Sequence, residues 1–247
     1  MKFHRKKLIV VIGSQPYRDL FKRFGHVSKK ASILFDLPDR VDMVVLSGGA
    51  DVQPSLYGGV DPYNLCYTAP KRDKLEQGIL ELCQKHRIKI TGICRGFQFL
   101  NVMAGGFMFP HVEGHAIRDM HEVYYQFSGE KILTNSYHHQ LVGLSKEGAL
   151  PIAWAEPRRS PLYVWPKGEI TRTIEQKEVE AAIFPKIRAM GVQYHPEDMS
   201  RKSFGRMHYE AIVHDFLELS ITKFIEIYGR KAENGQRTNR KTRRVGN

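Results

Sequence analysis

Short apolar runs alternate with longer amphipathic segments through the first half of the chain. The apolar runs are nearly continuous, which predicts strands buried on both faces, at residues 8–12, 42–46 and 88–93. The amphipathic segments predict helices at residues 17–24, 28–35, 73–86 and 96–104. This alternation predicts an α/β fold, doubly wound around a mostly parallel central sheet, with reactive loops at the carboxyl ends of the strands.

The second half has a different pattern of short apolar runs separated by turn residues. It predicts strands at residues 123–127, 132–135, 152–155, 163–165, 181–184 and 189–194. We expect these strands to be mainly antiparallel and either to be added to the main sheet or to lie beside it. A last amphipathic helix is predicted at residues 204–228.

Length, cysteine content and hydrophobicity restrict the number of domains and the cellular compartment that we expect. A length of 247 residues suits one large α/β domain or two small ones. The three cysteines have no paired spacing, which argues against a disulfide framework and favours a reducing, cytoplasmic compartment. No apolar run reaches the length of a membrane span, so no membrane partner is expected. The basic start followed by an apolar run is interpreted as a first buried strand rather than a signal peptide.

The positive charge gathers near the carboxyl end. The chain has a net charge of +12, and residues 230–247 hold seven basic residues and one acidic residue, a net charge of +6. We expect one domain over residues 1–229 and a disordered basic tail over residues 230–247. A solvated tail is favoured over an arm that binds nucleic acid or an acidic partner.

The strongest chemical signal is a cysteine between two glycines, directly after a predicted strand. Gly92-Ile93-Cys94-Arg95-Gly96 is the thiol counterpart of the Gly-x-Ser-x-Gly nucleophile elbow, in which a sharp turn joins a strand to a helix. Side chains at the two glycine positions would collide across such a turn. The helix N-terminus would favour a reactive thiolate. A buried, inert thiol is the default interpretation for Cys66 and Cys83, but not for Cys94.

A candidate base lies about a hundred positions further along the chain. A predicted strand leads into His195-Pro196-Glu197. Because residues two apart in an extended segment project to the same side, Glu197 can hold one ring nitrogen of His195 and stabilise the charged imidazole. An isolated histidine at a strand end would carry little weight, but a nucleophile elbow elsewhere in the chain favours a catalytic pair.

A glycine loop supplies a third element. Ser47-Gly48-Gly49 follows a predicted buried strand, where exposed backbone N–H groups can face an anion. Acyl transfer from an amide passes through an oxyanion that needs two such donors. We expect an oxyanion hole formed by the N–H groups of Gly49 and Arg95. A simple turn is the alternative for any Gly-Gly pair taken alone.

Five ordered motifs together resemble a known family. They are residues 48–58 (GGADVQPSLYG), 72–76 (RDKLE), 92–102 (GICRGFQFLNV), 135–140 (NSYHHQ) and 191–197 (GVQYHPE). The chain resembles a class I glutamine amidotransferase domain, and more narrowly the γ-glutamyl-γ-aminobutyrate hydrolase branch (peptidase C26). The resemblance implies a flavodoxin-like fold and a triad of Cys94, His195 and Glu197. It also implies cleavage of a small-molecule γ-glutamyl amide through a γ-glutamyl thioester, with no cofactor.

The resemblance also extends to the substrate pocket. Gln98 matches a position that helps to hold the glutamyl group. Four further positions are expected near the pocket mouth: Asn135, His138, His139 and Gln140. Asp51, Arg72 and Glu76 match family positions without an assigned role. Tyr194 stands where the family often has Trp or Phe, and the region before residue 42 is shorter than usual, which leaves the identity of the substrate open.

A histidine-rich stretch raises the question of a metal site. His111, His115 and His121 lie close together and are followed by His138 and His139. Their spacing fits no familiar ligand pattern, so polar histidines on loops are favoured and no metal is expected.

Two other functions remain open at this point. The chain could be the ammonia-donating glutaminase subunit of a two-chain synthetase, with a separate partner chain. It could also be a non-catalytic binding protein on the same scaffold, although all three triad residues are present.

Overall fold

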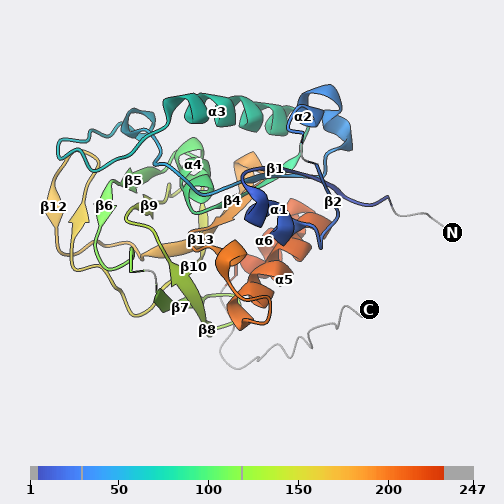
Figure 1. Ribbon diagram of the computed structural model, residues 1–247. Coiled ribbons are helices and arrows are strands. Elements are labelled where there is room, and N and C mark those ends of the chain that lie inside the picture. The colour runs from blue at the N-terminus through green and yellow to red at the C-terminus, as the bar shows by residue number, and fades with distance from the viewer. Residues whose placement is uncertain (1–4, 29, 118, 231–247) are drawn as a thin grey trace.

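A mostly parallel sheet runs through the centre of the molecule, with helices on both faces (Figure 1). We describe a computed structural model, in which residues 5–28, 30–117 and 119–230 can be described. The nine strands of this sheet, as far as the described residues show it, follow the order β2-β1-β3-β4-β14-β13-β10-β7-β8. The parallel half consists of β2 (His26–Ser28), β1 (Leu8–Ile12), β3 (Met43–Leu46), β4 (Lys89–Ile93) and β14 (Ala189–Val192).

The second half of the chain extends this sheet at one edge with antiparallel strands. They are β13 (Val179–Phe184), β10 (Leu150–Ala155), β7 (Asp119–Tyr125) and β8 (Glu130–Ser136). Two small sheets accompany them, made of β5 (Phe107–Phe109) with β9 (Leu141–Gly143), and of β6 (His111–Val112) with β11 (Tyr163–Val164) and β12 (Ile170–Thr171). The α/β, flavodoxin-like fold predicted from the sequence is therefore confirmed, including the added antiparallel strands.

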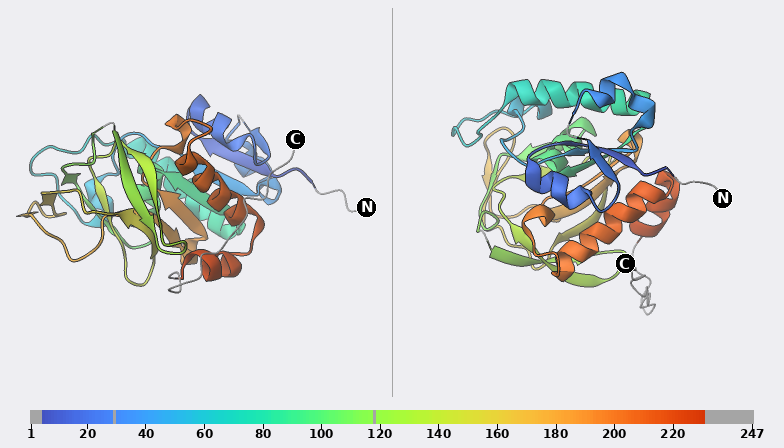
Figure 2. Two further views of the ribbon diagram at one scale, coloured as in Figure 1. Left: turned by 90° about the horizontal axis from the view of Figure 1, so that it is seen from below. Right: turned by 45° about the vertical axis from the view of Figure 1, so that its right-hand side comes forward.

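The helices form two layers, one on each face of the sheet (Figures 1 and 2). One layer holds α2 (Ile33–Asp36), α3 (Pro70–Lys85) and α4 (Arg95–Met103); the other holds α1 (Gln15–Phe21), α5 (Phe204–Glu218) and α6 (Ile221–Tyr228). Alternate residues of each strand serve the two layers, since Ile9 and Val11 pack with α5 while Val10 packs with α3. Both faces need apolar side chains, which explains the continuous apolar runs.

Two predicted helices differ in the structure. Where one helix was predicted at residues 28–35, β2 ends at Ser28 and α2 begins at Ile33. The single helix predicted at residues 204–228 is divided, because Leu219 is extended and the side chain of Ser220 accepts a hydrogen bond from the N–H of Lys223 at 3.1 Å, which starts α6.

The described residues end at Arg230, at the start of the predicted basic tail. Apart from Arg230, the basic tail predicted at residues 230–247 lies outside the described residues. Within the described residues, no helix has the length and apolar character needed to cross a membrane.

Candidate active site

The strands β4 and β14 bring the two halves of the site together. They are parallel neighbours in register, with Gly92 opposite Gly191 and Ile93 opposite Val192. The N–H of Cys94 extends this ladder by donating to the carbonyl of Val192 at 2.8 Å. Cys94 and His195, which follow these strands, therefore emerge at the same edge of the sheet, where the sequence predicted the reactive loops.

The turn at Cys94 has the strained geometry of a nucleophile elbow. Its backbone lies at φ 51° and ψ −109°, a conformation that non-glycine residues rarely adopt and that costs roughly 1–3 kcal/mol. Cys94 also occupies the N-cap position of α4, without a capping hydrogen bond from its side chain. A side chain at Gly92 would come within 2.3 Å of the carbonyl carbon of Gly96, and one at Gly96 within 2.3 Å of the carbonyl oxygen of Leu46. Both glycines are thus required sterically, as predicted.

The His195 ring is held by Glu197 and faces the cysteine. Its Nδ1 lies 2.7 Å from Oε1 of Glu197, and its buried Nε2 has no hydrogen-bond partner among the described residues. A Cβ atom placed on Gly48 would lie 3.0 Å from Cε1 of His195 and 3.4 Å from Cβ of Cys94, so both side chains border the same point. Burial lowers the pKa of His195, but Cys94 and Glu197 outweigh burial and raise this pKa to about 10. The resting imidazole is therefore charged at neutral pH.

Arg72 orients the glycine loop beside the cysteine. Its guanidinium donates to the carbonyl oxygens of Ser47 at 2.7 Å and Gly48 at 2.9 Å. In a trans peptide the N–H points opposite to the C=O, so the bond from Arg72 to Gly48 directs the N–H of Gly49 away from Arg72. Gly49 has φ 141° and lines the cavity that contains Cys94. These contacts suggest that Arg72, to which the sequence analysis assigned no role, orients the peptide between Gly48 and Gly49.

A buried charge network lies under this loop. The Arg95 side chain is fully buried, pairs with both Asp73 and Glu76, and donates to the carbonyl of Ala50 at 3.1 Å. Glu76 also accepts from Arg72 at 2.8 Å. The network ties α3 and α4 to the glycine loop. It therefore holds the two predicted oxyanion donors, the N–H groups of Gly49 and Arg95, on one rigid support.

A cavity of about 290 Å³ opens at Cys94. Its lining includes five residues predicted for the site, together with neighbours that were not predicted for it, and consists of Gly49, Ala50, Asp51, Tyr67, Cys94, Gln98, Tyr137, His138 and His139. Gln98 donates from its side-chain amide to Oε1 of Gln193 at 3.2 Å, which leaves its own oxygen free to accept. Nε2 of His139 lies 3.3 Å from the carboxylate of Asp51.

Two residues expected at the pocket mouth have protein partners instead. Asn135 contacts the backbone of His195, accepting from its N–H and donating to its carbonyl oxygen, each at 2.8 Å. Gln140 is fully buried and donates to the carbonyl of Pro110 at 3.2 Å. Neither residue lines the cavity. Both side chains therefore stabilise the protein around the cavity and do not face the space where a substrate would lie.

Sequence reasoning missed two tyrosines of the site. The Tyr17 hydroxyl accepts from the N–H of Gly48 at 3.1 Å, and burial together with the charges of Glu197 and Cys94 raises its pKa. The Tyr137 ring lies 5.3 Å from the ring of His195 and lines the cavity. A signal for Tyr17 was available, because α1 begins directly after β1, at the reactive edge of the sheet.

The fold and the site define a glutamine amidotransferase-like α/β protein, and comparisons place the chain within that class. The sequence profile of the Peptidase C26 family matches residues 26–197, and the chain belongs to this family. It is 30% identical over 207 residues to YvdE of Lactococcus lactis subsp. lactis, a protein named for its likeness to glutamine amidotransferases, with 74% of this chain and 79% of the relative covered.

Two further proteins illustrate the range of relatives. The γ-glutamyl-CDP-amidate hydrolase of Campylobacter jejuni is 31% identical over 140 residues, which cover 56% of this chain and 64% of that protein. Among solved structures, a glutamine amidotransferase from Thermotoga maritima superposes with a TM-score of 0.52 at 15% identity, covering 90% of each chain. At this identity the structural likeness supports the fold alone. The family, with γ-glutamyl hydrolases among its members, supports an amide-hydrolysing enzyme.

Proposed function

We propose that the protein hydrolyses the γ-glutamyl amide bond of glutamine or of a γ-glutamyl amine. The observation that carries the proposal is the facing pair of Cys94, in a strained elbow, and His195, held by Glu197 at 2.7 Å. The γ-glutamyl hydrolases among the relatives support the choice of substrate class. Cys94, His195 and Glu197 are the proposed catalytic residues.

The proposed reaction has two steps. The Cys94 sulfur attacks the γ-carbonyl carbon, and the N–H groups of Gly49 and Arg95 stabilise the oxyanion. His195 donates its proton to the departing nitrogen, the C–N bond breaks, and a γ-glutamyl thioester remains. His195 then takes a proton from water as the water oxygen attacks the thioester carbon, the C–S bond breaks, glutamate is released, and the pair of Cys94 thiolate and protonated His195 is restored.

The cavity suggests how the glutamyl group is held. Gln98 lies on α4, one turn after Cys94, with a free amide oxygen that can accept from the α-ammonium group of the substrate. The paired Asp51 and His139 lie on the cavity wall and can contact the charged α-amino acid end. The leaving amine would extend towards Tyr67 and Tyr137, the two aromatic residues of the lining.

The proposal is tested by a screen of γ-glutamyl amides, glutamine included, for released ammonia or amine. We expect wild type to turn over at least one of them, and Cys94→Ala to lose at least 10³-fold in kcat. Cys83→Ala is the matched control, because this buried cysteine lies on α3 and its pKa is raised by burial to about 12.

Two outcomes would contradict the proposal. Activity retained by Cys94→Ala would show that Cys94 is not the nucleophile. An intact wild-type protein that cleaves none of the amides, and whose Cys94 resists a glutamine-analogue electrophile, would favour a binding protein. Glutaminase activity that appears only when a second chain is added would indicate an ammonia-donating subunit that retains the same chemistry.

A further inference from the structure

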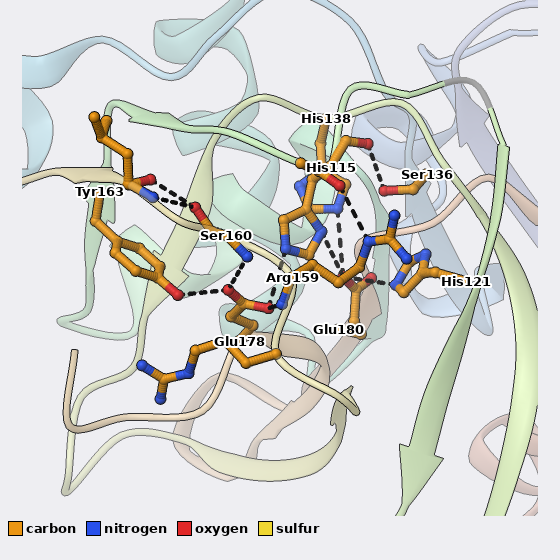
Figure 3. Close-up of polar contacts among 12 residues, drawn as sticks. His115, His121, Ser136, His138, Arg159, Ser160, Tyr163, Glu178 and Glu180 are labelled. Atoms are coloured by element: carbon orange, nitrogen blue, oxygen red, sulfur yellow. Dashed lines mark hydrogen bonds and ion pairs between the residues drawn. The ribbon is translucent and has the colours of Figure 1, made fainter. Parts of the chain in front are cut away.

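A group of buried histidines surrounds one carboxylate beside the candidate active site (Figure 3). His115 follows β6, His121 lies on β7, His138 follows β8, and Glu180 lies on β13. All four side chains are almost completely shielded from solvent. The sequence suggested polar histidines on loops, but the fold buries these three and brings them to one point from separate parts of the chain.

The three rings approach the same oxygen atom. Oε1 of Glu180 lies 3.5 Å from Nδ1 of His115, 3.3 Å from Nε2 of His121 and 3.4 Å from Nε2 of His138. In a tetrahedral site with bonds of about 2.0–2.1 Å, neighbouring ligand atoms lie about 3.3 Å apart. His115, His121 and Glu180 offer ligand atoms that all lie within 4.8 Å of one another. These three side chains are therefore close enough to share one small cation, and Nε2 of His138, 3.4 Å from Oε1 of Glu180, lies beside them.

These inward atoms have no hydrogen bonds. Nδ1 of His115, Nε2 of His121, Nε2 of His138 and both carboxylate oxygens of Glu180 are buried and make no aligned hydrogen bond among the described residues, although the three nitrogens lie within 3.5 Å of Glu180. Buried polar atoms are normally satisfied, and a group of this size calls for a missing partner. N–H groups of the rings could also contact Glu180 directly, but 3.3–3.5 Å is longer than the about 2.7–2.9 Å of a charged hydrogen bond, whereas one cation between the four side chains would satisfy them together.

The outward atoms of two rings are held as in known metal sites. Nδ1 of His138 lies 2.8 Å from the carbonyl oxygen of Gln140, which leaves Nε2 as a free lone pair facing Glu180. Nε2 of His115 lies 3.3 Å from Glu178, whose carboxylate accepts from the N–H groups of Arg159 and Ser160 at 2.7 and 2.8 Å. A ligating histidine commonly donates its other N–H to a backbone carbonyl or a carboxylate in this way.

We propose that His115, His121, His138 and Glu180 bind one divalent transition-metal ion of the zinc class. Three imidazoles and one carboxylate suit zinc, cobalt, nickel or copper rather than magnesium or calcium. Four buried protein ligands leave no open position, so the ion has a structural role. It joins β13 of the main sheet to the segment around His138, whose neighbours Tyr137 and His139 line the cavity. The site is independent of the proposed hydrolysis.

The test titrates metal-free wild-type protein with Co²⁺ and then with Zn²⁺. We expect one Co²⁺ per chain, with the visible absorption of four-coordinate cobalt, removed by one equivalent of Zn²⁺ and unaffected by Mg²⁺. Glu180→Gln and His121→Ala should bind Zn²⁺ about 100-fold or more weakly. His214→Ala is the matched control, because its histidine is exposed on α5 and should leave the binding unchanged.

Several outcomes would overturn the site. Wild type that shows no tetrahedral cobalt spectrum would exclude it whether or not the variants fold. Equal Zn²⁺ affinity in wild type and in a folded Glu180→Gln protein would place the ion on surface histidines. A chelator should also lower the melting temperature of wild type but not that of Glu180→Gln, and this readout does not depend on any enzymatic activity.

Discussion

The side chain of Asn135 forms hydrogen bonds with both the N–H and the carbonyl oxygen of His195. It accepts from the N–H and donates to the carbonyl oxygen, each at 2.8 Å. These two bonds connect β8, at one edge of the sheet, to the residue that follows the central strand β14. Glu197 contacts only the ring, so Asn135, together with the N–H of Asp198 that donates to the same carbonyl at 3.2 Å, holds the backbone from which the ring projects.

Replacing Asn135 by alanine should therefore lower kcat with little change in KM. We expect kcat to fall about 10²-fold, because a displacement of about 1 Å at a reacting group has an effect of that size. Steady-state kinetics on the best γ-glutamyl substrate would measure it. Thr134→Val is the control, since Thr134 is buried on the same strand and its hydroxyl has no hydrogen-bond partner in the described part of the chain. Equal losses in both variants would contradict a positioning role for Asn135.

A methyl group at Gly49 should damage the proposed oxyanion hole. It would come within 2.3 Å of Nη1 of Arg72, and φ 141° disfavours any side chain. We expect Gly49→Ala to lower kcat about 10²–10³-fold, the effect of losing one oxyanion donor. Gly58→Ala also places alanine at a positive φ, 66°, but with nothing within 4 Å and away from the cavity, and it should keep its kcat. Normal turnover by Gly49→Ala would rule out this donor.

Glu76 should matter for stability more than for chemistry. It is fully buried and pairs with Arg72 and Arg95, so Glu76→Gln leaves buried positive charge uncompensated. We expect the free energy of unfolding to fall by about 3–5 kcal/mol. Lys131→Met, which removes an exposed pair with Glu122, should change it by about 0.5 kcal/mol or less. Urea unfolding measures both, and similar values for the two variants would contradict the network's importance.

The raised pKa of His195 predicts how stability depends on pH. Its folded-state pKa of about 10 lies above the ordinary value of 6.5, so its contribution is complete below about pH 6.5 and is lost as the pH rises towards 10. Glu197→Gln removes one of the causes of this shift. The stability difference between wild type and Glu197→Gln should therefore narrow across this pH range.

Urea unfolding at a series of pH values would measure this difference. His214→Gln serves as the control, since its side chain is largely exposed and its curve should run parallel to that of wild type. A difference between wild type and Glu197→Gln that stays constant with pH would mean that the His195 ring is not charged in the folded protein.

Local patterns were sufficient to predict the central strands and the elbow. The bounds of β1 agree with the prediction, and the paired glycines around Cys94 are explained by backbone contacts of 2.3 Å. Such features depend on residues close in the sequence or on the continuous burial of one strand. The division of the last helix at Ser220 was missed because the amphipathic pattern continues across it.

The direction of individual side chains could not be predicted in the same way. Asn135 and Gln140 belong to a motif near the cavity, yet both point into the protein. The three histidines around Glu180 come from three separate segments, and the neighbouring positions of β8, β7, β10 and β13 in one sheet bring His121 and His138 to Glu180. Such juxtapositions depend on contacts between distant residues, which linear spacing does not encode.

Because β4 is aligned with β14, the placement of the reacting residues is separate from the shape of the cavity that receives the substrate. The positions of Cys94 and His195 are fixed by a ladder of backbone hydrogen bonds, which does not depend on which apolar side chains stand at the strand positions other than Gly92 and Gly191. Most of the cavity wall comes from loops outside that ladder. Evolution or a protein engineer could therefore exchange the loops to accept a new leaving group while the reacting atoms stay in place.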